Sequence, residues 1–435
     1  MDKYEKSKKL LKRAVEVTPL GAQTYSKSFR YYPLGNAPSF IERGEGCYLY
    51  DVDGNKFIDF VCALGPITIG YNIKEVNDAV INQLNNGISF SLQGEVEVIL
   101  AERLREIVPC AEMVRFVKNG SDATTAAIRL SRAYTGRDLV ALCGYHGMHD
   151  WSIGATENNR GIPEDVSKLT KKFEYNDIDS IKRLFDEYPN QIAAIILEPI
   201  QANGPKEGFL EELRKLTEDN GTILIFDEVV SGFRYALGGA SELYGVTPDL
   251  AAFGKGMGNG LPISAVAGKK EIMQLIEEGI FVSTTFGGET LSMAGSIAAL
   301  DILSQDGAYE KIWDLGTKMK NGLQDLVEKY QLQDVIIVSG LPPHCGVEFE
   351  GIKSLDYLDI ASVFYQTMVD NGILTVGINC LNLSHTEKEI NKYLEVSEKA
   401  MVEIKKAIEQ NSTVGILNCG KISPIFRRNI IEIDD

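Results

Sequence analysis

The sequence predicts an α/β protein with a mostly parallel central sheet and a second, smaller α+β part. Between about residues 95 and 300, short apolar runs alternate with stretches that carry apolar residues three and four positions apart. Strands that alternate with helices usually form a parallel sheet covered on both faces. Ligands bind such a sheet beyond the carboxyl ends of its strands, so a site is expected there. The expected strands are 114–117, 139–143, 192–197, 222–226 and 250–253.

The remaining elements follow from the same patterns. Residues 47–59 alternate in polarity around Asp53-Gly54, a pair that tolerates the positive φ of a tight turn, so they are expected to form a hairpin. We expect an N-terminal segment (1–60) that joins the small domain, a large domain (61–307) and a small C-terminal domain (308–435). Helices are expected at 122–134, 178–187, 210–220, 308–330, 360–371 and 387–409, and further strands at 335–338 and 346–349.

Composition and charge exclude several classes of function. The 44 basic and 61 acidic side chains of the 435 residues give a net charge of −17, which argues against a nucleic-acid partner because such proteins need a basic face. No run of about 18 apolar residues is present, and the N-terminal 18 residues form a basic amphipathic segment, so neither a membrane span nor a signal peptide is expected. The seven scattered cysteines never show C-x-x-C spacing. We therefore expect reduced thiols, a cytoplasmic location and no metal site.

An acid pair follows the apolar run that ends at Phe226. Asp227 and Glu228 would stand at the carboxyl end of a buried strand. A carboxylate at such a place stays charged only when it is paired with a cation or with a protonated ring. The alternative is a helix cap, which is a frequent role for an acid at a strand end.

A single lysine, Lys255, is enclosed by glycines after the next apolar run, in the sequence FGKGMGNG. Small neighbours leave room for a flat ligand and a partly desolvated amine, which suits a nucleophilic lysine. The segment is not a nucleotide-binding P-loop, because neither Ser nor Thr follows the lysine.

A third group, Lys118-Asn119-Gly120-Ser121-Asp122, lies between a strand and a helix. Its backbone amides, its hydroxyl group and the helix dipole suit a phosphate group, and the alternative is a simple capping loop. A phosphate-bearing cofactor would explain all three groups together. Pyridoxal 5′-phosphate (PLP) needs a lysine for its Schiff base, an acid at its pyridine nitrogen and a helix N-terminus for its phosphate.

These segments resemble the class III (subgroup II) PLP-dependent aminotransferases of fold type I, and most of all the branch that contains glutamate-1-semialdehyde aminomutase. The resemblance covers nearly the whole chain. The matching segments are 48–60, 119–137, 143–147, 198–204, 227–234, 253–262 and 284–294.

The resemblance implies a role for each matching residue. Lys255 would form the Schiff base and move a proton during the reaction, and Asp227 would hold the pyridinium. Gly120 and Ser121 would bind the phosphate, and Tyr145 would stack on the ring.

Further roles come from the same resemblance. Thr285 would reach the phosphate held by a partner subunit, which implies a homodimer with shared active sites. His146 would support the site or the fold, and Glu198 would support the pyridine edge. Either Gln201 or Asn203 would bond the 3′-oxygen of the ring, and Asn203 is the expected partner. His146 and His149 have H-x-x-H spacing but no third ligand, so they do not predict zinc.

The chain departs from the aminomutases where they recognise the substrate. Lys27 stands where they have a carboxylate-binding Arg, and a lysine cannot form the same two-pronged contact. Ala63-Leu64 replaces Ser-Trp, Lys118 replaces Asn in the Asn-Ser-Gly segment, and Glu289 replaces another Asn.

The sequence therefore predicts an aminotransferase that moves an amino group from a small-molecule donor such as glutamate to an aldehyde or ketone, for which a sugar-derived or other polar carbonyl compound is suggested. An intramolecular aminomutase or a racemase/epimerase at the same site is the alternative. A non-catalytic binding protein with this fold is disfavoured because Lys255, Asp227 and the phosphate segment are all present.

Overall fold

The computed structural model describes residues 2–423 and divides into two compact units. The small unit comprises Met1–Leu64, Ile69–Ile73 and Glu310–Asp435, and the large unit comprises Gly65–Thr68 and Lys74–Tyr309. The domain division expected from the sequence, at 60/61 and 307/308, stays a prediction. The two units differ from it at residues 61–64, 69–73 and 308–309.

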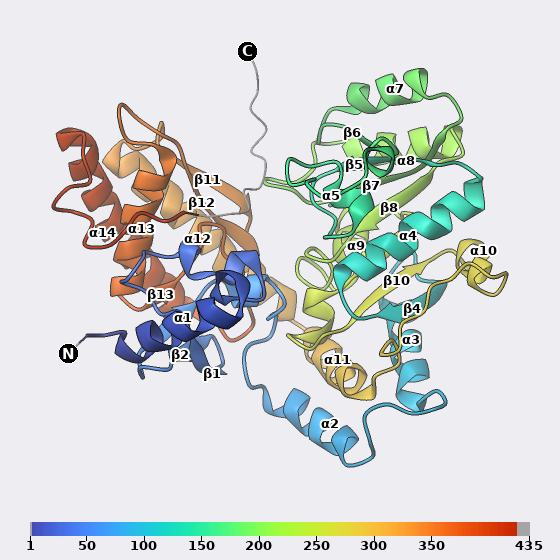
Figure 1. Cartoon of the computed structure of the whole chain (residues 1–435), viewed down its shortest axis with the longest axis horizontal. Helices are drawn as coiled ribbons and strands as arrows, with labels where there is room; N and C mark the ends of the chain where they lie inside the picture. The colour runs from blue at the N-terminus through green and yellow to red at the C-terminus, as the bar shows by residue number, and fades with distance from the viewer. Residues whose placement is uncertain (1, 424–435) are drawn as a thin grey trace. The chain divides into compact units, whose positions relative to one another are not determined.

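The large unit contains an α/β sheet, which confirms the predicted fold class (Figure 1). Within the described residues its seven strands have the order β4-β10-β9-β8-β7-β5-β6. Neighbours from β9 to β6 are parallel, whereas β10 is antiparallel to β9 and β4. The strands are β4 (Met113–Val117), β5 (Leu139–Cys143), β6 (Thr170–Lys172), β7 (Ile192–Leu197), β8 (Ile223–Asp227), β9 (Leu250–Phe253) and β10 (Ser264–Gly268).

The helices of the large unit cover this sheet because its central strands are apolar on both faces. Every residue of β7, β8, β9 and β10 is buried. Helix α4 packs against β4 and β7–β10, α8 packs on β8, and α11 packs on α2 and α3. The helices are α2 (Lys74–Leu84), α3 (Glu95–Ile107), α4 (Gly120–Thr135), α5 (Asp150–Ile153), α6 (Glu164–Ser167), α7 (Ile178–Glu187), α8 (Phe209–Asp219), α9 (Gly239–Tyr244), α10 (Lys270–Met273) and α11 (Thr290–Leu303).

The small unit contains the predicted N-terminal hairpin. Strands β2 and β3 pair around Asp53-Gly54, and the Asp51 carboxylate accepts hydrogen bonds from the turn amides of Asp53 and Asn55. Its strands are β1 (Ile41–Glu45), β2 (Tyr48–Asp51), β3 (Lys56–Asp59), β11 (Ile336–Leu341), β12 (His344–Phe349) and β13 (Ile373–Leu374). Its helices are α1 (Glu5–Val17), α12 (Ala308–Tyr330), α13 (Tyr357–Asp370) and α14 (Glu387–Gln410). A core of α12, α13 and α14 side chains, which includes Met319, Phe364 and Tyr393, stabilises this unit.

None of the helices within residues 2–423 combines the length and the apolar character that a membrane crossing requires.

Candidate active site

The acid pair lies at the carboxyl end of β8, and its two members have different surroundings. Asp227 is the last residue of the strand and is buried; its Oδ1 accepts a hydrogen bond from Val229 N at 3.1 Å, and its Oδ2 lies 2.8 Å from His146 Nδ1. Glu228 instead accepts hydrogen bonds from the Ser231 and Ser241 side chains and from two amides at the start of α9. The helix-cap alternative therefore describes Glu228, and Asp227 is the acid that contacts an imidazole ring.

The imidazole of His146 is fixed from both sides. Its Nε2 lies 2.9 Å from the Cys143 carbonyl, which can only accept a hydrogen bond, so Nε2 carries a proton. Its Nδ1 faces the Asp227 carboxylate, so the ring lies between two hydrogen-bond acceptors. The ring is completely buried and stacks with Trp151 at an interplanar angle of 6°. His146 therefore holds the Asp227 carboxylate in one orientation.

The loop that carries His146 also reaches the start of α4. Met148 N donates a hydrogen bond of 3.0 Å to the Ser121 side-chain oxygen, and Thr124 Oγ1 donates to the His146 carbonyl at 2.8 Å. Gly147 has φ 107°, and a β-carbon there would lie 2.4 Å from Ser121 Oγ. One loop, residues 144–148, therefore joins the acid of β8 to the hydroxyl group of α4.

The start of α4 has the form expected of an anion site. Asn119 caps the helix, because its side chain accepts from Asp122 N and the Asp122 carboxylate accepts from Asn119 N. Gly120 and Ser121 are the first two helical residues, and amides at these positions have no carbonyl partner within a helix. The cap and the phosphate interpretation are compatible: Asn119 forms the cap, and Gly120 and Ser121 offer the remaining donors.

Lys255 follows β9, the parallel neighbour of β8. Asp227 pairs in register with Ala252, so the acid and the lysine leave adjacent strands on the same edge of the sheet. Lys255 has φ 36°, in the left-handed region that costs a non-glycine residue about 1–2 kcal/mol. The flanking glycines are required by close protein packing: a β-carbon at Gly254 would lie 2.7 Å from Ser264 Oγ, and one at Gly256 would lie 3.0 Å from Thr68.

Val229 is a member of the site that the sequence interpretation missed. A β-carbon at Gly120 would lie 3.0 Å from its methyl groups, and one at Gly254 would lie 3.6 Å from Val229 Cγ1. Its side chain therefore stands between the start of α4 and the turn that carries Lys255. Val229 lies in the turn after β8, where its amide bonds to Asp227, and no local sequence pattern indicated its place.

The remaining predicted residues surround this group less tightly. Tyr145 is 44% exposed, and burial followed by the Asp227 charge raises the pKa of its phenol. Glu198 lies near Gly144, where a β-carbon would be 3.5 Å from Glu198 Oε1. Between the two residues proposed for the ring oxygen, Gln201 bonds the Cys143 carbonyl at 3.2 Å, whereas Asn203 is exposed on the adjacent turn.

Thr285 is exposed in the segment that precedes α11. At the end of that segment, two of the departures noted in the sequence meet: Lys118 Nζ lies 3.0 Å from Glu289 Oε2. No sequence rule pairs two positions that are so far apart along the chain.

The chemistry of these side chains and amides suits PLP. Asp227 is a buried carboxylate that suits a protonated ring nitrogen, and the Gly120 and Ser121 amides suit a phosphate. Within residues 2–423, no group of three or more His, Cys, Asp or Glu side chains is arranged to hold a metal ion.

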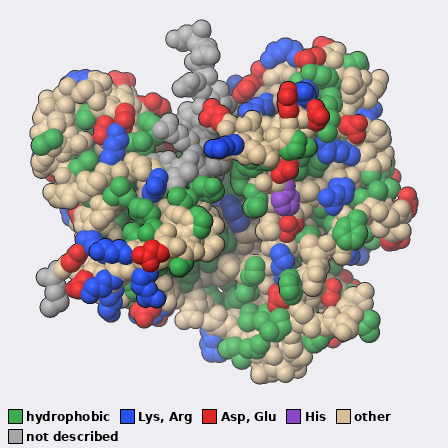
Figure 2. Space-filling view, viewed as in Figure 1, with side chains coloured by type: hydrophobic (Ala, Val, Ile, Leu, Met, Phe, Trp, Pro, Cys, Tyr) green, Lys and Arg blue, Asp and Glu red, His purple; other side chains and the backbone are tan. Residues whose placement is uncertain are grey.

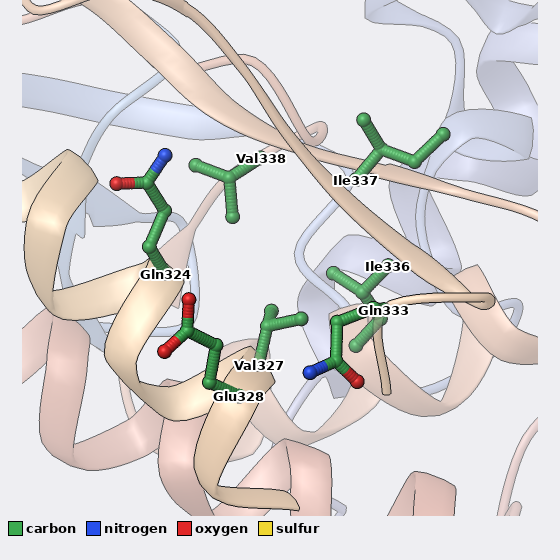
Figure 3. A pocket seen from close by; sticks show the side chains of 7 residues that line it. All are labelled: Gln324, Val327, Glu328, Gln333, Ile336, Ile337 and Val338. Atoms are coloured by element: carbon green, nitrogen blue, oxygen red, sulfur yellow. The ribbon is translucent and has the colours of Figure 1, made fainter. Parts of the chain in front are cut away.

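A surface hollow in the small unit offers no comparable chemistry. It lies between α12 and β11, and its polar side chains are Gln324, Glu328 and Gln333 (Figure 3). One acid and two amides beside valine and isoleucine provide neither an amine for a Schiff base nor a cation, so this hollow is not the candidate site.

Comparison with known proteins identifies the family. The model of the family "Aminotransferase class-III" matches residues 31–401. The chain belongs to the class-III aminotransferases, which confirms the resemblance drawn from its sequence segments.

Two relatives and one solved structure show how far the similarity extends. The chain is 37% identical over 417 residues to 3-aminobutyryl-CoA aminotransferase of Cloacimonas acidaminovorans, covering 93% of this chain and 99% of the relative. It is 36% identical over 430 residues to glutamate-1-semialdehyde 2,1-aminomutase of Methanosphaera stadtmanae, covering 93% and 100%. The FumI protein of Sphingopyxis sp. MTA144, solved in its PLP internal aldimine form, matches with a TM-score of 0.86 and 28% identity, covering 93% and 98%. The chain is thus a PLP-dependent aminotransferase of fold type I.

Proposed function

We propose that this enzyme moves an amino group from a small-molecule donor such as glutamate to an aldehyde or ketone. The observation that carries the proposal is the 144–148 loop, which contacts Asp227 through His146 and Ser121 through Met148. The loop that carries Tyr145 thus contacts both an acid suited to a ring nitrogen and a hydroxyl group suited to a phosphate. That arrangement matches the two polar ends of PLP.

Each residue of the site has its own part in the chemistry. PLP supplies an electron sink that makes the proton on the substrate carbon acidic. Asp227, held by His146, keeps a negative charge at the pyridine nitrogen, while Gly120 and Ser121 bind the phosphate. Lys255 holds the cofactor and, once its amine is released, moves the proton to and from the substrate carbon.

The acceptor is proposed to be a polar carbonyl compound, with a sugar-derived one as the first candidate. Lys27, in place of the carboxylate-binding Arg of the aminomutases, is exposed, and a lysine does not reproduce two-pronged carboxylate binding. The relative that acts on 3-aminobutyryl-CoA adds a second class to test, a β-amino thioester. Donors and acceptors of both kinds should be screened by following pyridoxamine phosphate formation chromatographically.

An aminomutase is the second candidate because one relative with 36% identity has that activity. The two functions differ in their need for a donor. A transferase releases a keto product from one substrate before a second substrate takes the amino group. A mutase interconverts substrate and product without a separate donor, and a racemase changes configuration without any transfer.

The active enzyme is proposed to be a cytoplasmic homodimer with shared active sites. Exposed apolar side chains gather over and just after α2, where Figure 2 shows a hydrophobic area: Ile81, Leu84, Ile88, Phe90 and Leu92. Phe281 and Phe286, on either side of Thr285, are also exposed, at 73% and 58%. Large exposed apolar surfaces of this kind mark interfaces, and light scattering of the purified chain measures the oligomeric state.

Lys255→Ala tests the assignment. Borohydride reduction of the PLP-loaded enzyme should attach the cofactor to Lys255, and the label should disappear from the variant because its attachment amine is gone. Peptide mass spectrometry measures the label. Lys215→Ala, a change on the exposed face of α8, is the control and should keep it. A label that persists on another lysine in the Lys255→Ala protein contradicts the proposal.

A further inference from the structure

Residues 281–289, here called the 281–289 segment, lie along the edge strand β4 and the helix that follows it. Arg129 of α4 donates a hydrogen bond to the Phe281 carbonyl at 2.6 Å, and Arg115 of β4 donates to the Val282 carbonyl at 3.1 Å. At the other end of the segment, Lys118 forms its 3.0 Å ion pair with Glu289. Three cations, one in β4, one in α4 and one between these two elements, therefore hold the segment at both ends.

The middle of the segment contacts the strand backbone and then projects outward. A β-carbon at Gly287 would lie 3.0 Å from the Phe116 carbonyl, so the segment passes close to β4 just before Lys118. Thr285 and Phe286 are exposed. The segment is thus fixed at its ends and presents Thr285 to the outside.

Glu289 is the residue on which this arrangement depends. It caps α11: Oε1 accepts from Leu291 N at 2.8 Å, and Oε2 accepts from the Ser292 hydroxyl at 2.5 Å and from Lys118. The Lys118 and Glu289 side chains are only 20% and 13% exposed. Burial raises the pKa of Glu289, but the hydrogen bonds from Ser292 and Lys118 bring it below its usual value. The ion pair is therefore charged and largely sheltered from solvent screening.

We propose that Lys118 and Glu289 form a positioning pair that fixes the 281–289 segment to the start of the phosphate site, so that Thr285 is held ready for the phosphate bound by a partner subunit. The inference rests on the proposed cofactor site and homodimer. Lys118 immediately precedes Asn119, the cap of α4, so the pair ties the segment directly to the helix that offers Gly120 and Ser121. In this proposal the ammonium group serves Glu289, and the phosphate is left to the neutral donors of Gly120 and Ser121.

A double-mutant cycle tests the pair in the full-length enzyme. Lys118→Met and Glu289→Gln keep side-chain size but remove one charge each. Each should weaken PLP binding roughly five- to tenfold, and the double variant should be no weaker than either single one because both remove the same interaction. The PLP dissociation constant is measured by titrating apoenzyme. Lys118→Arg, which keeps the charge, should restore most of the affinity.

Hydrogen exchange supplies a readout independent of turnover. The amides of residues 281–289 should exchange faster in both single variants, whereas the rest of the large unit should be unchanged. The matched control is the exposed pair between Lys182 and Glu212, 2.8 Å apart on α7 and α8; Lys182→Met and Glu212→Gln should change neither PLP affinity nor exchange in the segment.

Two outcomes would overturn the proposal. If Lys118→Met weakens PLP binding while Glu289→Gln leaves it unchanged or strengthens it, Lys118 binds the phosphate directly. If all variants bind PLP as the parent enzyme does and the segment exchanges at the same rate, the pair positions nothing. Failure of the proposed function is a different result, because the parent enzyme itself would then not attach PLP to Lys255.

Discussion

Asp227 and Glu228 are neighbours in the chain, yet their side chains leave the strand on opposite sides. Asp227 contacts His146, whereas Glu228 is completely buried and turns to the start of α9. Burial raises the pKa of Glu228, although four hydrogen bonds to its carboxylate oppose that change. The alternation of side chains in a strand therefore separates an acid that can serve the cofactor from one that stabilises the fold.

Asp227→Asn should retain PLP but lower kcat about 10²–10³-fold, because the pyridine nitrogen loses its counter-charge at the transition state. In the parent enzyme, Val229 N and His146 Nδ1 each approach one oxygen of the Asp227 carboxylate. The asparagine side chain replaces one of these oxygens with an NH₂ group. The measurement is kcat for each molecule of borohydride-trappable cofactor.

Asp249→Asn is the matched control for that experiment, since Asp249 is a buried acid that precedes β9 and pairs with Arg214 at 2.9 Å. It should lower stability without lowering kcat per bound cofactor. Near-parental turnover in Asp227→Asn would show that Asp227 does not stabilise the reaction.

At the scale of elements, the loop between β5 and α5 aligns two otherwise separate parts of the site. Gly147→Ala should weaken PLP binding by roughly tenfold or more, because a β-carbon 2.4 Å from Ser121 Oγ must displace the first turn of α4. Titration of the apoenzyme with PLP measures the effect.

Gly161→Ala separates this steric effect from backbone strain. Gly161 also has a positive φ, 95°, and no atom lies within 4 Å of the β-carbon position. The change should cost about 1 kcal/mol of stability and leave PLP affinity unaltered. Equal PLP affinities in both alanine variants would contradict the role given to Gly147.

The sequence predicted those strands and helices in which the spacing of apolar residues reflects the burial of the element itself. The expected strand 139–143 and the helix 308–330 coincide with β5 and α12. The antiparallel strand β10 was not predicted, because its residues Ser-Ala-Val-Ala-Gly are small and its direction depends on pairing with β9 and β4. Helix α4 begins at Gly120, two residues earlier than expected, because the Asn119–Asp122 cap extends it.

At the scale of the whole molecule, two buried groups of the small unit give opposite responses to pH. Burial lowers the pKa of His385 from 6.5 to about 4, and its ring stacks on Phe60. Burial raises the pKa of Asp59 from 3.8 to about 6 although Tyr71, Val61 and Cys62 donate hydrogen bonds to its carboxylate. Since the folded state binds fewer protons at His385 and more at Asp59 than the unfolded state, His385 makes stability rise with pH and Asp59 makes it fall.

His385→Gln should reveal how much His385 contributes to the pH dependence of the free energy of unfolding. The free energy of unfolding lost in the variant should be about 2 kcal/mol greater at pH 7 than at pH 5, because only the neutral ring contributes to the fold. Urea unfolding of the variant and the parent at both pH values measures the difference. Phe60→Leu removes the stacked ring without removing the titrating group, so its stability loss should stay constant over this range. A pH-independent loss in His385→Gln would contradict the prediction.

Sequence by itself determined the fold class, the segments that form the strands carrying the site, and the identity of Lys255, Asp227, Gly120 and Ser121 as candidates. These follow from local chemistry: apolar runs form buried strands, and glycine, lysine and acid residues at strand ends are recognisable one segment at a time. Only the tertiary structure decided that His146 fixes Asp227, that Val229 stands between two loops, and that Lys118 meets Glu289. Each of these is a contact between distant segments, and such contacts depend on strand order and packing, which no local pattern contains.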